Sequence, residues 1–78
     1  MITTLDMLRE EDSAIVRAVL GGHGIRHRLE NLGVHPGDGV KVVRAGFLGG
    51  PVLIEIGGAR VAVGRGMARN IEVEIEGK

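Results

Sequence analysis

Cysteine, tryptophan and tyrosine are absent from this chain of 78 residues, and Phe47 is its single aromatic residue. Without cysteine, the protein has no disulfide to stabilise it and no thiolate to bind a metal or act as a nucleophile. Without an aromatic cluster, it lacks the stacking platform that binds single-stranded nucleic acids and the groove that recognises proline-rich peptides. We therefore expect neither nucleic acid nor a proline-rich peptide as a partner.

Net charge is also absent, because ten Lys and Arg residues balance ten Asp and Glu residues. A strongly basic surface for nucleic acid is therefore not indicated. No apolar run approaches the ~20 residues of a membrane span. The first residues have neither the basic start nor the apolar core of a signal peptide. The sequence predicts a cytoplasmic protein with no direct membrane insertion.

Groups able to do catalysis are few. The hydroxyl nucleophiles are Ser13 and two threonines near the start of the chain. None of the three histidines stands in a context that suggests a general base held by a second residue. We predict that the protein is not an enzyme, that it has no catalytic residues and that it uses no cofactor.

His23 and His27 are the candidate metal ligands, since side chains four residues apart on a helix can reach one ion. They lie opposite the apolar side of the helix expected there, so a site built on them would face solvent. A zinc site needs three or four ligands, and this pair is incomplete. The simpler interpretation is two polar residues on a wet face. A metal-binding or metal-sensing protein is kept as the alternative function.

What the chain does contain is glycine, with 14 glycines and two prolines separating short apolar runs. This pattern is typical of a small β-barrel with tight turns. We predict one domain over residues 1–78 that is mainly β: a five-stranded barrel with one short inserted α-helix at about residues 23–32. Residues 3–8 are expected to form a helical turn that begins after Thr4, with Leu5 and Leu8 on one side. The expected strands are 14–20, 40–44, 52–56, 59–63 and 71–76.

Two of the strands carry clear side-chain patterns. In 14–20 the all-apolar face, which includes Ala18 and Leu20, is expected to point to the core. In 71–76 three aliphatic residues alternate with three glutamates, whose solvated face would suit an edge strand.

The end of the helix is the best-specified stretch. Ile25, Leu29 and Leu32 form its expected buried stripe. Gly33 stands where a left-handed residue is needed, and the contact that would follow is between Leu29 and Val34, as in a Schellman motif. Pro36 and Gly37 suit the two central positions of a type II turn. Between the last two strands, Gly64 to Arg69 predicts a single helical turn.

Protein contact is the remaining class of function. Phe47 and Leu48 stand in a glycine-bounded loop, and Met67 precedes the last strand. Apolar residues outside regular strands mark interaction sites when they are exposed. Arg26 and Arg28 lie on the outer side of the helix and complete the candidate partner-binding set. The alternative is that the three apolar residues close the open ends of the barrel.

The order of these elements resembles the FeoA family over nearly the whole chain. The resemblance is carried by Ala14-Ile15-Val16, by Arg28-Leu29 with Leu32-Gly33-Val34 and Pro36-Gly37, by Gly49-Gly50-Pro51, and by 68–73. The chain departs from the family pattern at Glu11-Asp12, where a Pro-Gly turn is usual, and at 64–68, where the family has a charged segment.

The resemblance implies an SH3-like barrel that acts as a small cytosolic partner of FeoB, the GTPase-coupled ferrous iron permease. It also implies a likeness to the SH3-like domain appended to metal-dependent repressors, although no DNA-binding segment is present here. The implied function is an accessory protein of ferrous iron uptake that binds its partner through protein contacts. Homo-oligomerisation is left open.

Overall fold

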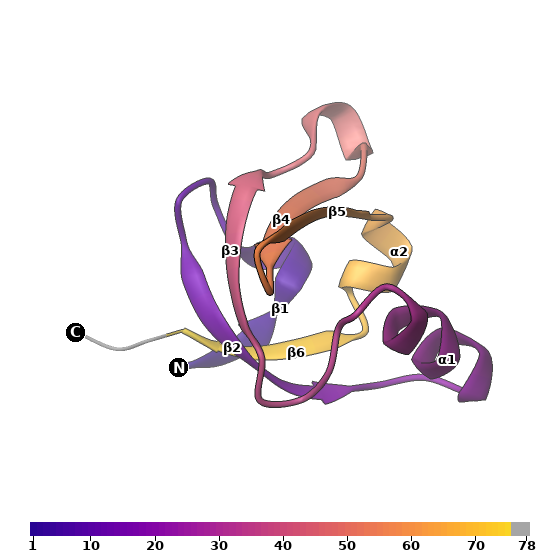
Figure 1. Ribbon diagram of the computed structural model, residues 1–78. Helices are drawn as coiled ribbons and strands as arrows, with labels where there is room; N and C mark the ends of the chain where they lie inside the picture. The colour runs from indigo at the N-terminus through magenta and orange to yellow at the C-terminus, as the bar shows by residue number, and fades with distance from the viewer. Residues whose placement is uncertain (76–78) are drawn as a thin grey trace.

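One antiparallel sheet of six strands, in the order β1-β6-β2-β3-β4-β5, forms the body of the protein and curls around its core (Figure 1). The computed structural model describes residues 1–75, apart from the side chain of Phe47. The described strands are β1 (Ile2–Thr4), β2 (Ser13–Val19), β3 (Gly39–Arg44), β4 (Val52–Ile56), β5 (Ala59–Val63) and β6 (Ile71–Ile75).

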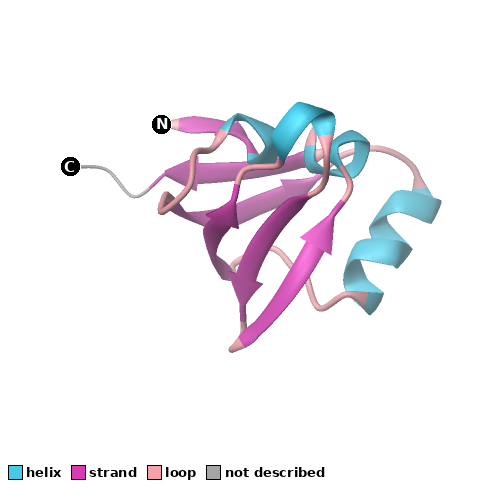
Figure 2. Ribbon diagram, turned by 90° about the horizontal axis from the view of Figure 1, so that it is seen from above, coloured by secondary structure: helices cyan, strands magenta, loops and turns pink. Residues whose placement is uncertain are grey.

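Helical segments occupy the connections. The longest, α1 (His23–Asn31), joins β2 to β3 and lies to one side of the sheet in Figure 2. The others are single turns: η1 (Leu5–Met7), η2 (Phe47–Gly49) and α2 (Arg65–Ala68). The single turn predicted between the last two strands is confirmed by α2, and the inserted helix is confirmed by α1.

The mainly β barrel predicted from the sequence is confirmed, with one strand more than expected. The extra strand is β1, whose Thr3 lies opposite Val73 of β6. A helical turn was expected over residues 3–8, but only Leu5–Met7 is helical, as a 3₁₀ turn. The Thr4 hydroxyl donates to Oδ1 of Asp6 at 2.5 Å instead of capping the turn through a backbone N–H. The start of the chain is thus extended because β6 offers it a pairing edge.

Apolar side chains from every strand except β1 fill the core, together with Leu5 and Leu8 from the first turn, which lie on one side as predicted. Burial of such side chains is the main stabilising term of a small domain. The buried set is Leu5, Leu8, Ala14, Val16, Leu29, Val34, Val40, Val42, Val52, Ile54, Ile56, Val63, Ala68, Ile71 and Val73.

A bulge in β2 changes which face of this strand is buried. Val16 pairs with Val73, but the register then shifts, so that Val19 lies opposite Ile71. An extra residue in a strand reverses the direction of the side chains that follow it. Val19 therefore packs against the core, while Leu20 is 45% exposed. The predicted core face of 14–20 is correct before the bulge and wrong after it.

The position of β6 in the sheet also differs from the prediction. It lies between β1 and β2, so the expected edge strand is an interior one, and β1 and β5 are the edges. Its glutamate face is still partly exposed, and Oε1 of Glu74 accepts a 2.6 Å hydrogen bond from Nε of Arg17. Glu76, which the sequence placed in this strand, lies outside the described residues.

The turn predictions hold. Gly33 has φ +86°, and the N–H of Val34 donates to the Leu29 oxygen at 2.9 Å, which is the long bond of a Schellman motif. Gly37 has φ +95°, as a type II turn after Pro36 requires. One detail of the helix is wrong. Leu32 follows the last residue of α1 and is 41% exposed, so Leu29 is the fully buried member of the predicted stripe.

Candidate functional site

The loop between β3 and β4 presents Leu48 to solvent. This side chain is 88% exposed, the highest value among the large hydrophobic residues of the described chain. Its backbone has φ 54° and ψ 43°, a left-handed conformation that leucine rarely adopts. The sequence predicted an apolar loop here, and the structure makes Leu48 its tip. Phe47 begins the same turn.

The base of this loop is narrow. Gly46 has φ +83°, and a Cβ added there would lie 2.4 Å from the Gly50 oxygen and 2.8 Å from the Pro51 oxygen. Nη2 of Arg65, from α2, donates to the carbonyl oxygens of Ala45 at 2.8 Å and Gly46 at 3.1 Å. The Arg65 contact could not be predicted from the sequence, because the two segments are some twenty residues apart and no local pattern links them.

A hollow of about 600 Å³ opens beside the loop. Its lining is mostly apolar or backbone, with one acidic and one basic side chain. The lining residues are Glu10, Arg44, Ala45, Gly46, Gly50, Pro51, Leu53 and Ala62.

The outer side of α1 is the second candidate region. Arg26 and Arg28 are both exposed, as are His23 and His27. A hollow of about 290 Å³ lies between this helix and the bulged part of β2, and Arg26 reaches its rim. Its lining residues are Arg17, Ala18, Val19, Arg26, Glu30, Val34 and Pro36.

The structure does not bring these two regions together. In Figure 1 the turn η2 lies at the top of the molecule and α1 at the lower right, with α2 between them. Met67, from α2, is partly buried and packs against the core.

Within the described part of the chain, no third ligand joins His23 and His27. Within residues 1–75, no group of three His, Cys, Asp or Glu side chains lies close enough together to hold a metal ion. His35, the third histidine, is paired instead with Asp38, whose Oδ2 lies 3.5 Å from its Nδ1.

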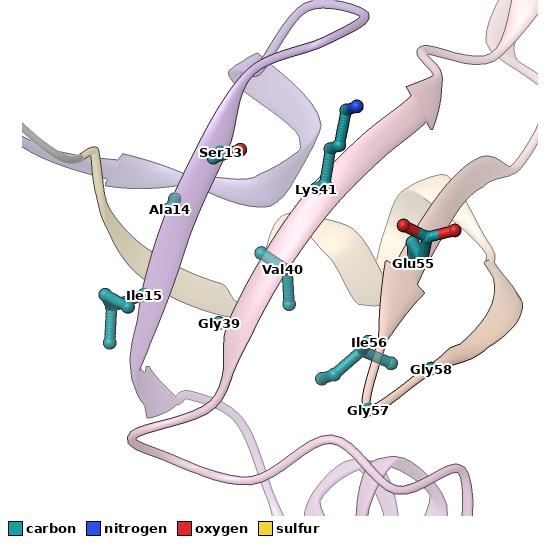
Figure 3. A pocket seen from close by; sticks show the side chains of 10 residues that line it. All are labelled: Ser13, Ala14, Ile15, Gly39, Val40, Lys41, Glu55, Ile56, Gly57 and Gly58. Atoms are coloured by element: carbon teal, nitrogen blue, oxygen red, sulfur yellow. The ribbon is translucent and has the colours of Figure 1, made fainter.

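A third hollow, of about 330 Å³, is lined by residues of β2, β3 and β4 beside the β4–β5 hairpin (Figure 3). Its charged side chains are paired: Nζ of Lys41 lies 3.2 Å from Glu11, and Oε2 of Glu55 lies 3.7 Å from Arg60. Ser13 also lines it, but no histidine does.

Across residues 1–75, no helix has both the length and the apolar character needed to cross a lipid bilayer.

Comparison with known proteins agrees with this geometry. The model of the FeoA domain family matches residues 3–75. A protein of Methanocaldococcus jannaschii whose assigned name is Fe(2+) transport protein A is 37% identical over 70 residues, which cover 90% of this chain and 83% of that protein.

Solved structures give the same result. The crystal structure of an iron uptake regulatory protein, FeoA, is 34% identical, with a TM-score of 0.89 over 97% of this chain and 99% of that one. The FeoA protein of Chlorobium tepidum is 32% identical, with a TM-score of 0.86 over 96% and 71% of the two chains. A manganese-dependent transcriptional repressor has a TM-score of 0.89 at 18% identity, over 96% of this chain and 42% of the repressor, and so shares the fold alone. From the family model and the relatives above 30% identity, this chain belongs to the FeoA family.

Proposed function

We propose that this protein is an accessory component of ferrous iron transport that binds a cytosolic part of a FeoB-type permease. The observation that carries the proposal is Leu48, a leucine 88% exposed at the tip of a loop and held at φ 54°. Exposed apolar residues in strained backbone are found where a protein meets a partner. Iron transport itself is supported by family membership and by the name of the relative from Methanocaldococcus jannaschii.

The docking residues are Leu48 with Phe47 in the loop, and Arg26 with Arg28 on α1. These are two separate regions, with α2 between them (Figure 1). A partner either contacts both regions across α2 or binds mainly to the loop. We place the main contact at the loop, because covering Leu48 would remove a whole leucine side chain from water, whereas ion pairs of exposed arginines contribute only about 0–1 kcal/mol. Met67 completes the predicted set from α2, where it is partly buried against the core.

The test replaces Leu48 by asparagine, which is polar and adopts the left-handed conformation readily. The fold should therefore be retained while the apolar contact is lost. A Leu side chain buried in an interface contributes about 1.5–3 kcal/mol. We accordingly expect Leu48→Asn to weaken binding to the cytosolic domain of the cognate permease by at least about tenfold.

Met7→Asn is the matched control, because Met7 is 68% exposed in another turn of the chain. It should leave the affinity unchanged. Equal affinities of the wild-type protein and Leu48→Asn, measured by titration calorimetry, would remove the loop as the docking site. No binding by the wild-type protein would remove the permease as the partner.

A further inference from the structure

We propose that Arg65 is the positioning residue of a preorganised docking surface, which consists of Leu48 and the hollow beside its loop. The inference deepens the proposed function and rests on it, because it assumes that this loop is the part that meets the partner. Arg65 lies outside the loop, on α2.

Arg65 contacts the loop through its guanidinium group. A single nitrogen, Nη2, donates to two successive carbonyl oxygens, those of Ala45 and Gly46. Hydrogen bonds from a charged donor are stronger than those between neutral groups. Nε of the same side chain is buried without a hydrogen-bond partner among residues 1–75. Burying such a group is unfavourable, so the carbonyl contacts must offset its burial.

At Gly46 the two sides of the loop and the Arg65 side chain approach one another closely. A Cβ at this position would lie 2.9 Å from Nη2 of Arg65 as well as 2.4 Å from the Gly50 oxygen. Both sides of the loop and the guanidinium therefore meet at one point, which only glycine can occupy. Arg65 closes the base of the loop by bonding there.

The tip of the loop, Leu48, has a strained backbone with φ 54°. A leucine in the left-handed region persists only when the surrounding structure holds it there. Leu48 has almost no side-chain contact to hold it, since 88% of it is exposed. The restraint must come from the backbone on either side, which the closed base of the loop supplies. A tip that is already ordered spares the partner the entropic cost of ordering it.

The hollow beside the loop shares residues with the base of the loop. Ala45, Gly46, Gly50 and Pro51 form the base of the loop and also part of the lining of the 600 Å³ hollow. The contact of Arg65 with Ala45 and Gly46 thus fixes both the tip of the loop and the side of the hollow that the loop lines. The partner that fits is an apolar segment, with a pocket for Leu48 and a side chain that enters the hollow, which Glu10 and Arg44 also line.

The experiment compares Arg65→Met, which keeps the aliphatic length but removes the donors, with Arg60→Met as the matched control. Arg60 is an exposed arginine on β5 whose Nε lies 3.7 Å from Glu55 of its own hairpin. The first readout needs no partner: backbone ¹⁵N relaxation of the free protein. In Arg65→Met we expect the order parameter of Leu48 to fall from about 0.85 to below about 0.6. The strands should keep their values, and Arg60→Met should leave the loop unchanged.

The second readout is affinity for the cytosolic domain of the permease. If the closed loop falls to about a tenth of the population, the apparent affinity falls about tenfold. Arg65→Lys, which can still donate to a carbonyl, should recover part of both losses. Gly46→Ala should reproduce the effect of Arg65→Met by another route, because its Cβ forces the base of the loop open.

The outcomes separate the two proposals. An ordered loop in both Arg65→Met and Gly46→Ala overturns the positioning role, whatever the permease does. A mobile loop with unchanged affinity overturns the link between positioning and docking. If Arg65→Met makes the loop mobile but the wild-type protein does not bind the permease, the proposed function is overturned. The contact between Arg65 and the loop then still stands.

Discussion

The N–H of Val34 donates a 2.9 Å hydrogen bond to the carbonyl oxygen of Leu29, and both side chains are buried to within 1% of complete burial. This bond closes the end of α1 and directs the chain back to the sheet. It also packs the helix on the core, which a helix of nine residues needs in order to be stable. The geometry depends on Gly33, which lies between them at φ +86°.

Gly33→Ala should therefore lower stability. A Cβ at Gly33 meets no atom within 4 Å, so the cost is conformational and amounts to about 1–2 kcal/mol. Gly24→Ala is the control, since Gly24 lies inside α1 and also has open space around it. There alanine should stabilise the helix by about 0.5–1 kcal/mol. Urea denaturation measures both, and shifts of the same sign would contradict this account.

Leu5→Ala should be among the most damaging changes near the start of the chain. Leu5 is 1% exposed, and truncating a buried leucine costs about 2–5 kcal/mol. Met7→Ala, in the same turn, removes a side chain that is 68% exposed and should change stability by less than about 0.5 kcal/mol. Thermal unfolding followed by circular dichroism compares the two. Similar melting temperatures for both variants would mean that this segment does not belong to the core.

Leu48→Asn should keep or raise the stability of the free protein, by up to about 1 kcal/mol, because asparagine relieves the left-handed strain at this position. Leu32→Asn is the comparison. Leu32 is 41% exposed and has φ −83°, so it carries no such strain, and loss of its apolar contacts should destabilise the protein. Chemical denaturation of both variants checks the expectation. A large loss of stability in Leu48→Asn would mean that Leu48 packs in solution.

Titration with Zn²⁺ and Fe²⁺ tests the alternative function. His23 and His27 lie exposed on α1, and no third ligating group joins them within residues 1–75. Two ligands make an incomplete site, so we expect weak binding that does not saturate at micromolar metal. A one-to-one site found by calorimetry in the wild-type protein and lost in His27→Ala would establish metal binding instead.

The parts of the fold that were predictable are those set by neighbouring residues. Gly33 and the Pro36-Gly37 pair require specific backbone angles, and these can be recognised without knowing what lies across the sheet. The Gly57-Gly58 connection is of the same kind, with φ +57° and +80°.

The errors came from pairing between distant strands. The face of Val19 depends on a bulge that exists only because β2 runs beside β6. The interior position of β6 depends on β1, and a three-residue strand is too short to give an alternating pattern. In the same way, the exposed tip at Leu48 could be predicted from its apolar loop, whereas the role of Arg65 could not, since arginine in a short turn has no distinguishing pattern.

The interior position of β6 has a further consequence for how the chain folds. Residues 71–75 pair with β1, near the first residue, and with β2. Neither strand can complete its hydrogen bonding before the last strand has been synthesised, and contacts between distant segments slow folding. The pairing of β1, and of the β6-facing edge of β2, must therefore wait until residues 71–75 have left the ribosome. A nascent chain that stops short of these residues presents open strand edges, and so is the form most exposed to aggregation and proteolysis.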